Sequence, residues 1–218
     1  MKKVFLSIAA VAAMVFTAQA QFSIIPKAGV TLGTFSFKEK PESLKSKLGF
    51  VAGAGFNLPV GDGGFSLQPE ILYTQKGFAY TESEDGIDVD AKHTWGLIEV
   101  PVLAKYTFGE DAFKFYINAG PSFGYVLNGK TKASGGGFDV NVDYEFDSDS
   151  DNRLDIGVQA GAGISYEVGP GSIILDARYG YGLTNYIKTP DGGDKADYKS
   201  QSRTFAVTVG YSIPLGGK

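Results

Sequence analysis

The sequence has no cysteine, a single histidine and a single tryptophan among its 218 residues. The absence of cysteine excludes a disulfide framework and leaves no cysteine for an N-terminal lipid anchor. Beyond the N-terminus there is no apolar run of roughly 18 residues or more, so no helix of the mature chain is expected to span a membrane. The net charge of −4 argues against a nucleic-acid partner.

The first twenty residues have the layout of a secretory signal peptide. Lys2 and Lys3 precede an apolar run over 4–16, and Ala18-Gln19-Ala20 follows as a small-residue cleavage site. A retained anchor helix is the alternative, but the apolar run is too short to span a bilayer comfortably. We therefore predict a signal peptide at 1–20, export from the cytoplasm, and one β domain over 21–218.

Apolar and polar residues alternate along much of the chain, most regularly in FKFYINAGPSFGYVL at 113–127. A period of two predicts a β-strand with one apolar face. Strands of this kind are predicted at 22–34, 48–58, 65–77, 94–108, 113–127, 154–168, 173–184 and 203–213. Short Gly- and Asp-rich turns at 59–64, 109–112 and 169–171 alternate with long segments at 35–47, 78–93, 128–153 and 185–202. This order predicts an all-β fold, an eight-stranded antiparallel up-and-down transmembrane β-barrel.

The two faces of the predicted strands differ in charge. One face is bulky and apolar and carries no charged residue; in 113–127 it consists of Phe113, Phe115, Ile117, Phe123 and Tyr125. The other face is rich in glycine and holds equal numbers of basic and acidic residues, namely Lys27, Lys76, Lys105, Lys114 and Arg178 with Glu70, Glu99, Asp155, Glu167 and Asp176. A charge facing lipid at mid-bilayer costs about 2–4 kcal/mol, whereas the surface of a secreted β-sandwich has no need of a charge-free face. The apolar face is therefore predicted to contact outer-membrane lipid.

Polar groups on the charged face are predicted to form a network inside the barrel. The predicted members lie mostly at similar depth, and they are Lys27, Glu70, Glu99, Lys105, Asn118, Asp176 and Arg178. Glu70 and Lys105 lie on neighbouring strands and are predicted to pair, because buried charges are tolerated when paired. Paired charges would close the lumen. Charges that are merely solvated would instead leave a narrow channel for ions or small solutes.

Five phrases carry a resemblance to a known family: IEVPVLAKYTF, YINAGPSFGYVL, LDIGVQAGAGISYEV, RYGYGLTNY and TFAVTVGYSIPL. The mature chain resembles the small outer-membrane β-barrel proteins labelled "porin family" in the Bacteroides group of Gram-negative bacteria. The resemblance implies an eight-stranded barrel in the outer membrane. It also implies that prolines inside strands are a common feature of the family. The family has no motif that fixes an activity, so no catalytic residue is implied. Four prolines, Pro26, Pro69, Pro101 and Pro121, are each expected at a β-bulge.

Catalysis is the alternative considered for His93. Some outer-membrane barrel enzymes combine histidine with serine and an acid, and Ser83, Glu84 and Asp85 lie in the same predicted loop as His93. Because a lone loop histidine is usually just solvated, the protein is predicted not to be an enzyme.

The long segment 128–153 holds the remaining candidates. Its part FDVNVDYEF, at 138–146, alternates and is predicted to be strand beyond the membrane, exposing a face to a surface partner. Asp147, Asp149 and Asp151 follow and form a candidate weak Ca²⁺ site, since alternating aspartates supply hard oxygen ligands. A solvated acidic tip is the alternative. No other cofactor is predicted, and the protein is expected to be a monomer with a structural or surface-interaction role.

Overall fold

The structure is a computed structural model and describes residues 22–37, 43–84, 87–147, 151–186 and 200–215. The predicted signal peptide at 1–20 lies outside these residues. Within the described residues no helix is long and apolar enough to cross a membrane.

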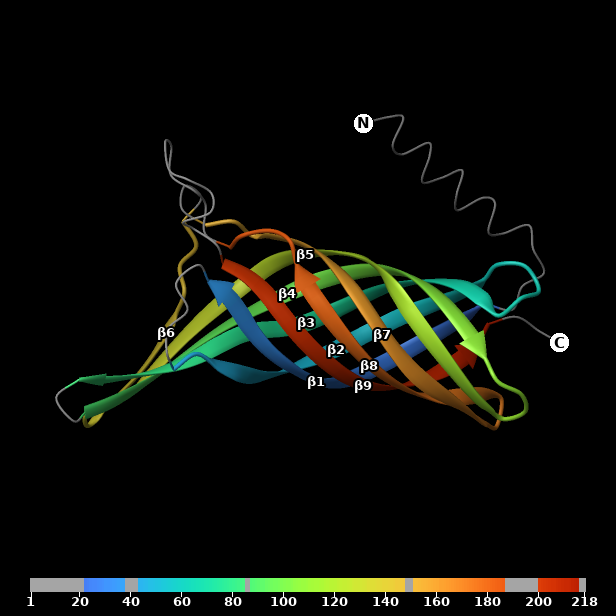
Figure 1. The fold of residues 1–218 in the computed structure, drawn as a ribbon, viewed down its shortest axis with the longest axis horizontal. Helices are drawn as coiled ribbons and strands as arrows, with labels where there is room; N and C mark the ends of the chain where they lie inside the picture. The colour runs from blue at the N-terminus through green and yellow to red at the C-terminus, as the bar shows by residue number, and fades with distance from the viewer. Residues whose placement is uncertain (1–21, 38–42, 85–86, 148–150, 187–199, 216–218) are drawn as a thin grey trace, which may run out of the picture.

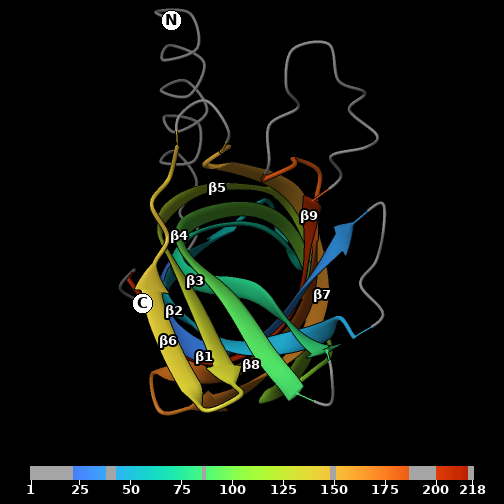
Figure 2. The ribbon, with the colours of Figure 1, turned by 90° about the vertical axis from the view of Figure 1, so that its left-hand side faces the viewer.

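Nine antiparallel strands make up the described fold. They are β1 (Ser23–Phe37), β2 (Lys45–Pro59), β3 (Phe65–Glu84), β4 (Ile87–Phe108), β5 (Phe113–Gly135), β6 (Phe138–Asp143), β7 (Leu154–Val168), β8 (Gly171–Gly182) and β9 (Ser200–Pro214). Each strand pairs with its neighbour in the order β4-β3-β2-β1-β9-β8-β7-β5-β6, and β4 also pairs with β5. This last pairing closes eight strands into a ring, which Figure 2 shows end-on, and leaves β6 outside it. The predicted fold is therefore confirmed.

The two ends of the barrel differ in their connections. At the turn end, β2 and β3, β4 and β5, and β7 and β8 are joined by a few residues each, and Gly61, Gly64, Gly109 and Gly169 adopt positive φ angles there. The first pair of β1 and β9, Ser23 with Pro214, also lies at this end. The other ends of the ring strands lie at the opposite end of the barrel, which we call the loop end (Figure 1).

Three strands continue well past the ring at the loop end. The segment 78–93 was predicted to be a loop, but its described residues extend β3 and β4 as a hairpin that pairs from Phe78 with His93 to Glu84 with Ile87. β5 extends alongside as far as Gly135, and β6 pairs with this extension. We call the resulting four-stranded layer, residues 77–84, 87–96, 128–135 and 138–143, the projecting sheet (Figure 1). Many polar residues interrupt the apolar–polar alternation in 78–93, and for this reason the sequence does not predict strands there.

The in-strand prolines do not lie at bulges. The ladders shift register only between Ser46 and Val51 and between Gly96 and Leu97, among the pairs that the structure describes. Each proline instead sits where the ladder to one neighbouring strand skips two residue pairs without losing register. The missing N–H of proline is thus accommodated by locally unpaired backbone, and the expected bulges were wrong.

The outer surface of the ring carries large apolar side chains, as predicted. Leu48, Ile71 and Ile117 are more than half exposed there, at 66, 57 and 55 %. Exposed aromatic side chains gather toward the turn end. They form a continuous row of contacts across β4, β5 and β7, in the order Tyr106, Phe108, Phe115, Phe113 and Tyr166. A belt of this kind marks a lipid–water interface.

Candidate functional site

A first group of buried polar side chains fills the lumen on the side of the turn end. Glu70, only 1 % exposed, lies at its centre. The Lys27 ammonium is 2.6 Å from Glu70 Oε1, and Arg178 Nη1 donates to Glu70 Oε2 at 2.8 Å. Gln68 Nε2 also donates to Glu70 Oε1, at 2.6 Å. One carboxylate therefore pairs with two cations, from β1 and β8, on strands that are not its neighbours. We call this group, with Tyr116, Asn118 and Asp176, the turn-side cluster.

Asp176 holds the rest of the turn-side cluster together. It accepts hydrogen bonds from Tyr116 Oη at 2.9 Å and from Asn118 Nδ2 at 2.8 Å, and Arg178 Nη2 lies 3.1 Å from its Oδ1. The Tyr116 ring crosses directly over Gly163, where a Cβ would overlap the ring. Glycine on the inner face of β7 thus creates the space that a large inward-facing ring needs.

Lys105 does not pair with Glu70, contrary to the sequence prediction. Within the described part of the chain, no carboxylate lies within 4.0 Å of its ammonium, which instead sits over the Tyr116 ring at 4.1 Å from the centroid. The prediction joined the carboxylate to the cation on the neighbouring strand. In a narrow barrel the side chains of Lys27 and Arg178 reach Glu70 across the lumen, which strand adjacency does not reveal.

A second group, the loop-side cluster, lies nearer the loop end. The Lys76 ammonium is 2.7 Å from both Glu99 Oε1 and Asp155 Oδ2. Thr74 donates to Glu99 at 3.3 Å, and the Tyr186 hydroxyl donates to Asp155 at 3.0 Å. Glu99 was a predicted network member. The sequence places Lys76 and Asp155 on the inner face but not in the predicted network, and Tyr186 falls in a segment that is predicted to be a loop.

The two clusters leave little free volume between them. A cavity of about 30 Å³ separates them, lined by Lys27, Lys76, Glu99, Asp176 and Arg178 among others. It has room for roughly one or two water molecules. The turn-side cluster with Lys105 has one excess positive charge and the loop-side cluster one excess negative charge, so the lumen is balanced overall. The arrangement can pair charges and fix strand register.

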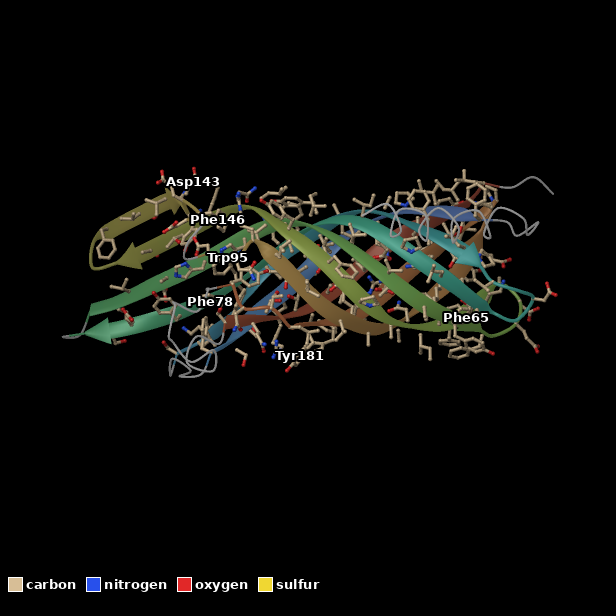
Figure 3. All side chains as sticks on the ribbon, turned by 90° about the horizontal axis from the view of Figure 1, so that it is seen from above. Phe65, Phe78, Trp95, Asp143, Phe146 and Tyr181 are labelled. Atoms are coloured by element: carbon tan, nitrogen blue, oxygen red, sulfur yellow. The ribbon has the colours of Figure 1, made fainter. Side chains whose placement is uncertain are left out.

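Aromatic side chains pack together next to the loop-side cluster, on the side of the loop end. Phe35, Leu97, Val126 and Tyr186 form a buried apolar core, against which Phe37, Phe78, Trp95 and Phe146 pack. Figure 3 shows Phe78, Trp95 and Phe146 gathered at the loop end, far from Phe65 at the turn end. Beside these rings lies a cavity of about 180 Å³.

The structure does not bring together the residues of the catalytic alternative, His93 and Ser83. His93 Nδ1 contacts the Thr131 hydroxyl at 3.0 Å, and its ring lies among those of Phe78, Tyr80 and Trp95. Ser83 instead donates to Asp88 at 2.5 Å, five residue pairs further along the hairpin. Asp85 lies outside the described residues. Ser83 and His93 therefore do not form a nucleophile–base pair.

The predicted Ca²⁺ site is only partly described. Asp149 lies outside the described residues, whereas the Asp147 backbone N–H donates to Asp151 Oδ2 at 2.9 Å and Tyr144 donates to Asp151 Oδ1 at the same distance. Across the described ranges, no three acidic, histidine or cysteine side chains are grouped closely enough to hold a metal ion. The Ca²⁺ site stays a prediction.

The comparisons with known proteins concern the barrel as a whole. The chain is similar to Neisserial surface protein A, with 19 % identity over 90 % of this chain and 98 % of that chain and a TM-score of 0.48. It is also similar to Ail, the attachment invasion locus protein of Yersinia pestis, with 19 % identity over 88 % of this chain and 99 % of that chain and a TM-score of 0.41. No curated protein matches the sequence.

A family model matches a large continuous part of the chain. This model, described as an outer membrane protein beta-barrel domain, covers residues 17–188 and hence seven of the eight ring strands at least in part. The porin label and the Bacteroides group stay predictions. The chain belongs to the family of outer membrane protein beta-barrel domains.

Proposed function

We propose that the protein is a non-conducting outer-membrane barrel that acts as a surface-interaction protein, docking an extended segment of a partner protein on its projecting sheet. Family membership implies the outer membrane. Outer-membrane barrels have short periplasmic turns and longer extracellular loops, so the loop end and its projecting sheet lie outside the cell. The barrel then serves as a rigid base that holds this sheet above the lipid.

The observation that carries this proposal is the exposed edge strand β6. It pairs with β5 on one side only, so its other edge has no strand partner among the described residues. All six of its residues are exposed. An unpaired edge presents a row of backbone donors and acceptors on which a partner segment can add as a further strand.

The side chains of β6 favour a partner with an alternating pattern. Phe138, Val140 and Val142 share one face and are 46, 45 and 50 % exposed. The opposite face carries Asp139, Asn141 and Asp143, and Asp143 lies 3.4 Å from Lys130 on β5. An added strand would therefore be fixed by backbone hydrogen bonds and selected by apolar side chains on one face. We keep the prediction that the barrel itself is monomeric.

Site-specific photocross-linking in intact cells tests this proposal. A photoreactive phenylalanine analogue in place of Val140 is expected to give a discrete adduct with a surface or extracellular protein. The same analogue at Ile117, a lipid-facing position of β5, is the matched control and should give no such adduct. Val142→Lys, which charges the apolar face of β6, should remove the adduct while the barrel stays folded. An adduct that persists in Val142→Lys, or none at position 140, would contradict the proposal.

A channel is the alternative function, and it would need an open lumen. The salt-bridged clusters and the 30 Å³ cavity between them support the non-conducting form instead.

A further inference from the structure

The 180 Å³ cavity at the loop end belongs neither to the charged lumen nor to the exposed edge of β6. Side chains from β1, β3 and β4 line it, together with side chains from 144–147 and 151–152 and with Tyr186 and Ser200. Its lining residues are Phe35, Phe37, Phe78, His93, Trp95, Tyr144, Phe146, Asp151, Asn152, Tyr186 and Ser200. Eight of these eleven carry an aromatic ring. Such a concentration of rings around a cavity is unlike the rest of the lumen, where charges predominate.

The aromatic rings that line the cavity pack against one another in defined stacked, tilted and edge-on geometries. His93 stacks on Trp95 with an interplanar angle of 19° and a centroid distance of 6.0 Å, and Phe78 lies 5.0 Å from His93 at 30°. Tyr186 meets Phe35 edge-on at 79°. Its hydroxyl is held by Asp155 of the loop-side cluster, so the floor of the cavity is anchored to the salt-bridged lumen. A planar ring could add to this arrangement in offset-stacked or edge-on geometry.

The polar groups of the cavity suit a neutral ligand. Burial lowers the pKa of His93 and so favours the neutral imidazole. His93 Nδ1 is engaged with Thr131, and its other ring nitrogen has no hydrogen-bond partner among the described residues. Asp151 is the one charged residue of the lining, and each of its oxygens already accepts a hydrogen bond, from Tyr144 and from the Asp147 backbone. Burial, with the hydrogen bond to Asp151, raises the pKa of Tyr144 to about 12, so Tyr144 keeps its proton.

We propose that this cavity binds a small neutral aromatic molecule: one ring bearing a hydroxyl group, with the ring among Phe78, Trp95 and Tyr186 and the hydroxyl toward the free nitrogen of His93. The size fits, because an apolar cavity of about 150 Å³ accommodates benzene. The cavity lies at the extracellular end, where small phenolic compounds could reach it without crossing the membrane. A ligand with so few atoms is expected to bind weakly, with a Kd on the order of 1 mM.

The single tryptophan of the chain makes the test direct, since Trp95 lines the cavity. Phenol titrated into the full-length folded protein in detergent should change Trp95 emission, excited beyond the absorption of phenol, along a saturable curve. Cyclohexanol, which has similar size and the same hydroxyl but no aromatic ring, should bind at least about tenfold more weakly. A phenol response that is linear, as in partition into the micelle, or equal saturation by cyclohexanol would overturn the proposal.

Two variants separate the cavity from the surrounding micelle. Phe78→Leu removes one ring of the wall and should weaken phenol binding about tenfold, whereas Phe50→Leu on the lipid face should leave it unchanged. His93→Phe keeps a ring at that position but removes the free nitrogen. It should abolish the preference for phenol over toluene while toluene binding stays the same. Should Phe78→Leu fail to fold, the His93→Phe comparison decides alone, and a retained preference for phenol would contradict the assigned binding mode.

Discussion

Replacing Glu70 by alanine is expected to destabilise the folded barrel by about 3–5 kcal/mol, the usual loss when one partner of a buried ion pair is removed. The carboxylate forms ion pairs with both Lys27 and Arg178, and the Glu70 and Lys27 side chains are almost fully buried. Without it, the Lys27 ammonium and the Gln68 amide would lose their buried acceptor, and Arg178 would keep only Asp176 as an ionic partner. The midpoint of urea unfolding, followed by the mobility difference between folded and unfolded protein on a gel, measures the loss.

Matched variants identify the partners of Glu70. Glu167→Ala breaks the exposed pair with Lys114 at the turn end and should cost at most about 1 kcal/mol, because 52 % of the Glu167 and 37 % of the Lys114 side chain is exposed. Adding Lys27→Ala to Glu70→Ala should recover part of the loss, because it removes one stranded cation. Adding Lys105→Ala should give no such recovery. If Lys105→Ala rescues and Lys27→Ala does not, the pairing seen in the lumen is wrong.

Replacing Lys76 by methionine is expected to have an effect of similar size in the loop-side cluster. Methionine keeps most of the volume but leaves Glu99 and Asp155 as two buried carboxylates whose shared cation is gone. Like charges confined in a site of low dielectric repel, and neither oxygen gains a new donor. Stability should fall by about 3–5 kcal/mol in the same unfolding assay.

Removing all three charges provides the control for Lys76. The triple variant Lys76→Met, Glu99→Gln, Asp155→Asn has no stranded charge and should be more stable than Lys76→Met alone. A triple variant that loses the sum of its single effects would show that the three side chains are not coupled. That outcome would remove the loop-side cluster as a structural unit.

The sequence predicts the barrel well because lipid imposes a strict rule on one face. Ile117 and Phe123 could be assigned to lipid since every second residue of their strand is apolar and uncharged, and Lys27, Glu70 and Arg178 followed onto the inner face. Short turns such as 109–112 were recognisable from their glycine and aspartate. Strand alternation and turn composition are both local properties of the sequence, and they apply equally to every strand of a closed barrel.

The contacts across the lumen could not be predicted in the same way. Glu70 meets Arg178 from a strand far away in the ring, and which of several cations reaches it depends on side-chain length and depth. The extension of β3 and β4 was missed because residues beyond the membrane no longer need an uninterrupted apolar face. The aromatic cavity was missed for a related reason: Phe35, Phe37 and Tyr186 lie in segments that were predicted to be loops. Phe35 and Phe37 lie four and six residues after the inward-facing Thr31, so in a continued strand they share its face. This spacing is the signal that could have revealed part of the cavity.

Single-channel recording on the purified, folded protein in planar bilayers tests the central claim most directly. We propose that the turn-side and loop-side clusters and the aromatic core close the lumen, so the protein should show no stable channel. Reproducible, long-lived open states of porin size would contradict the closed lumen and would establish the channel in its place.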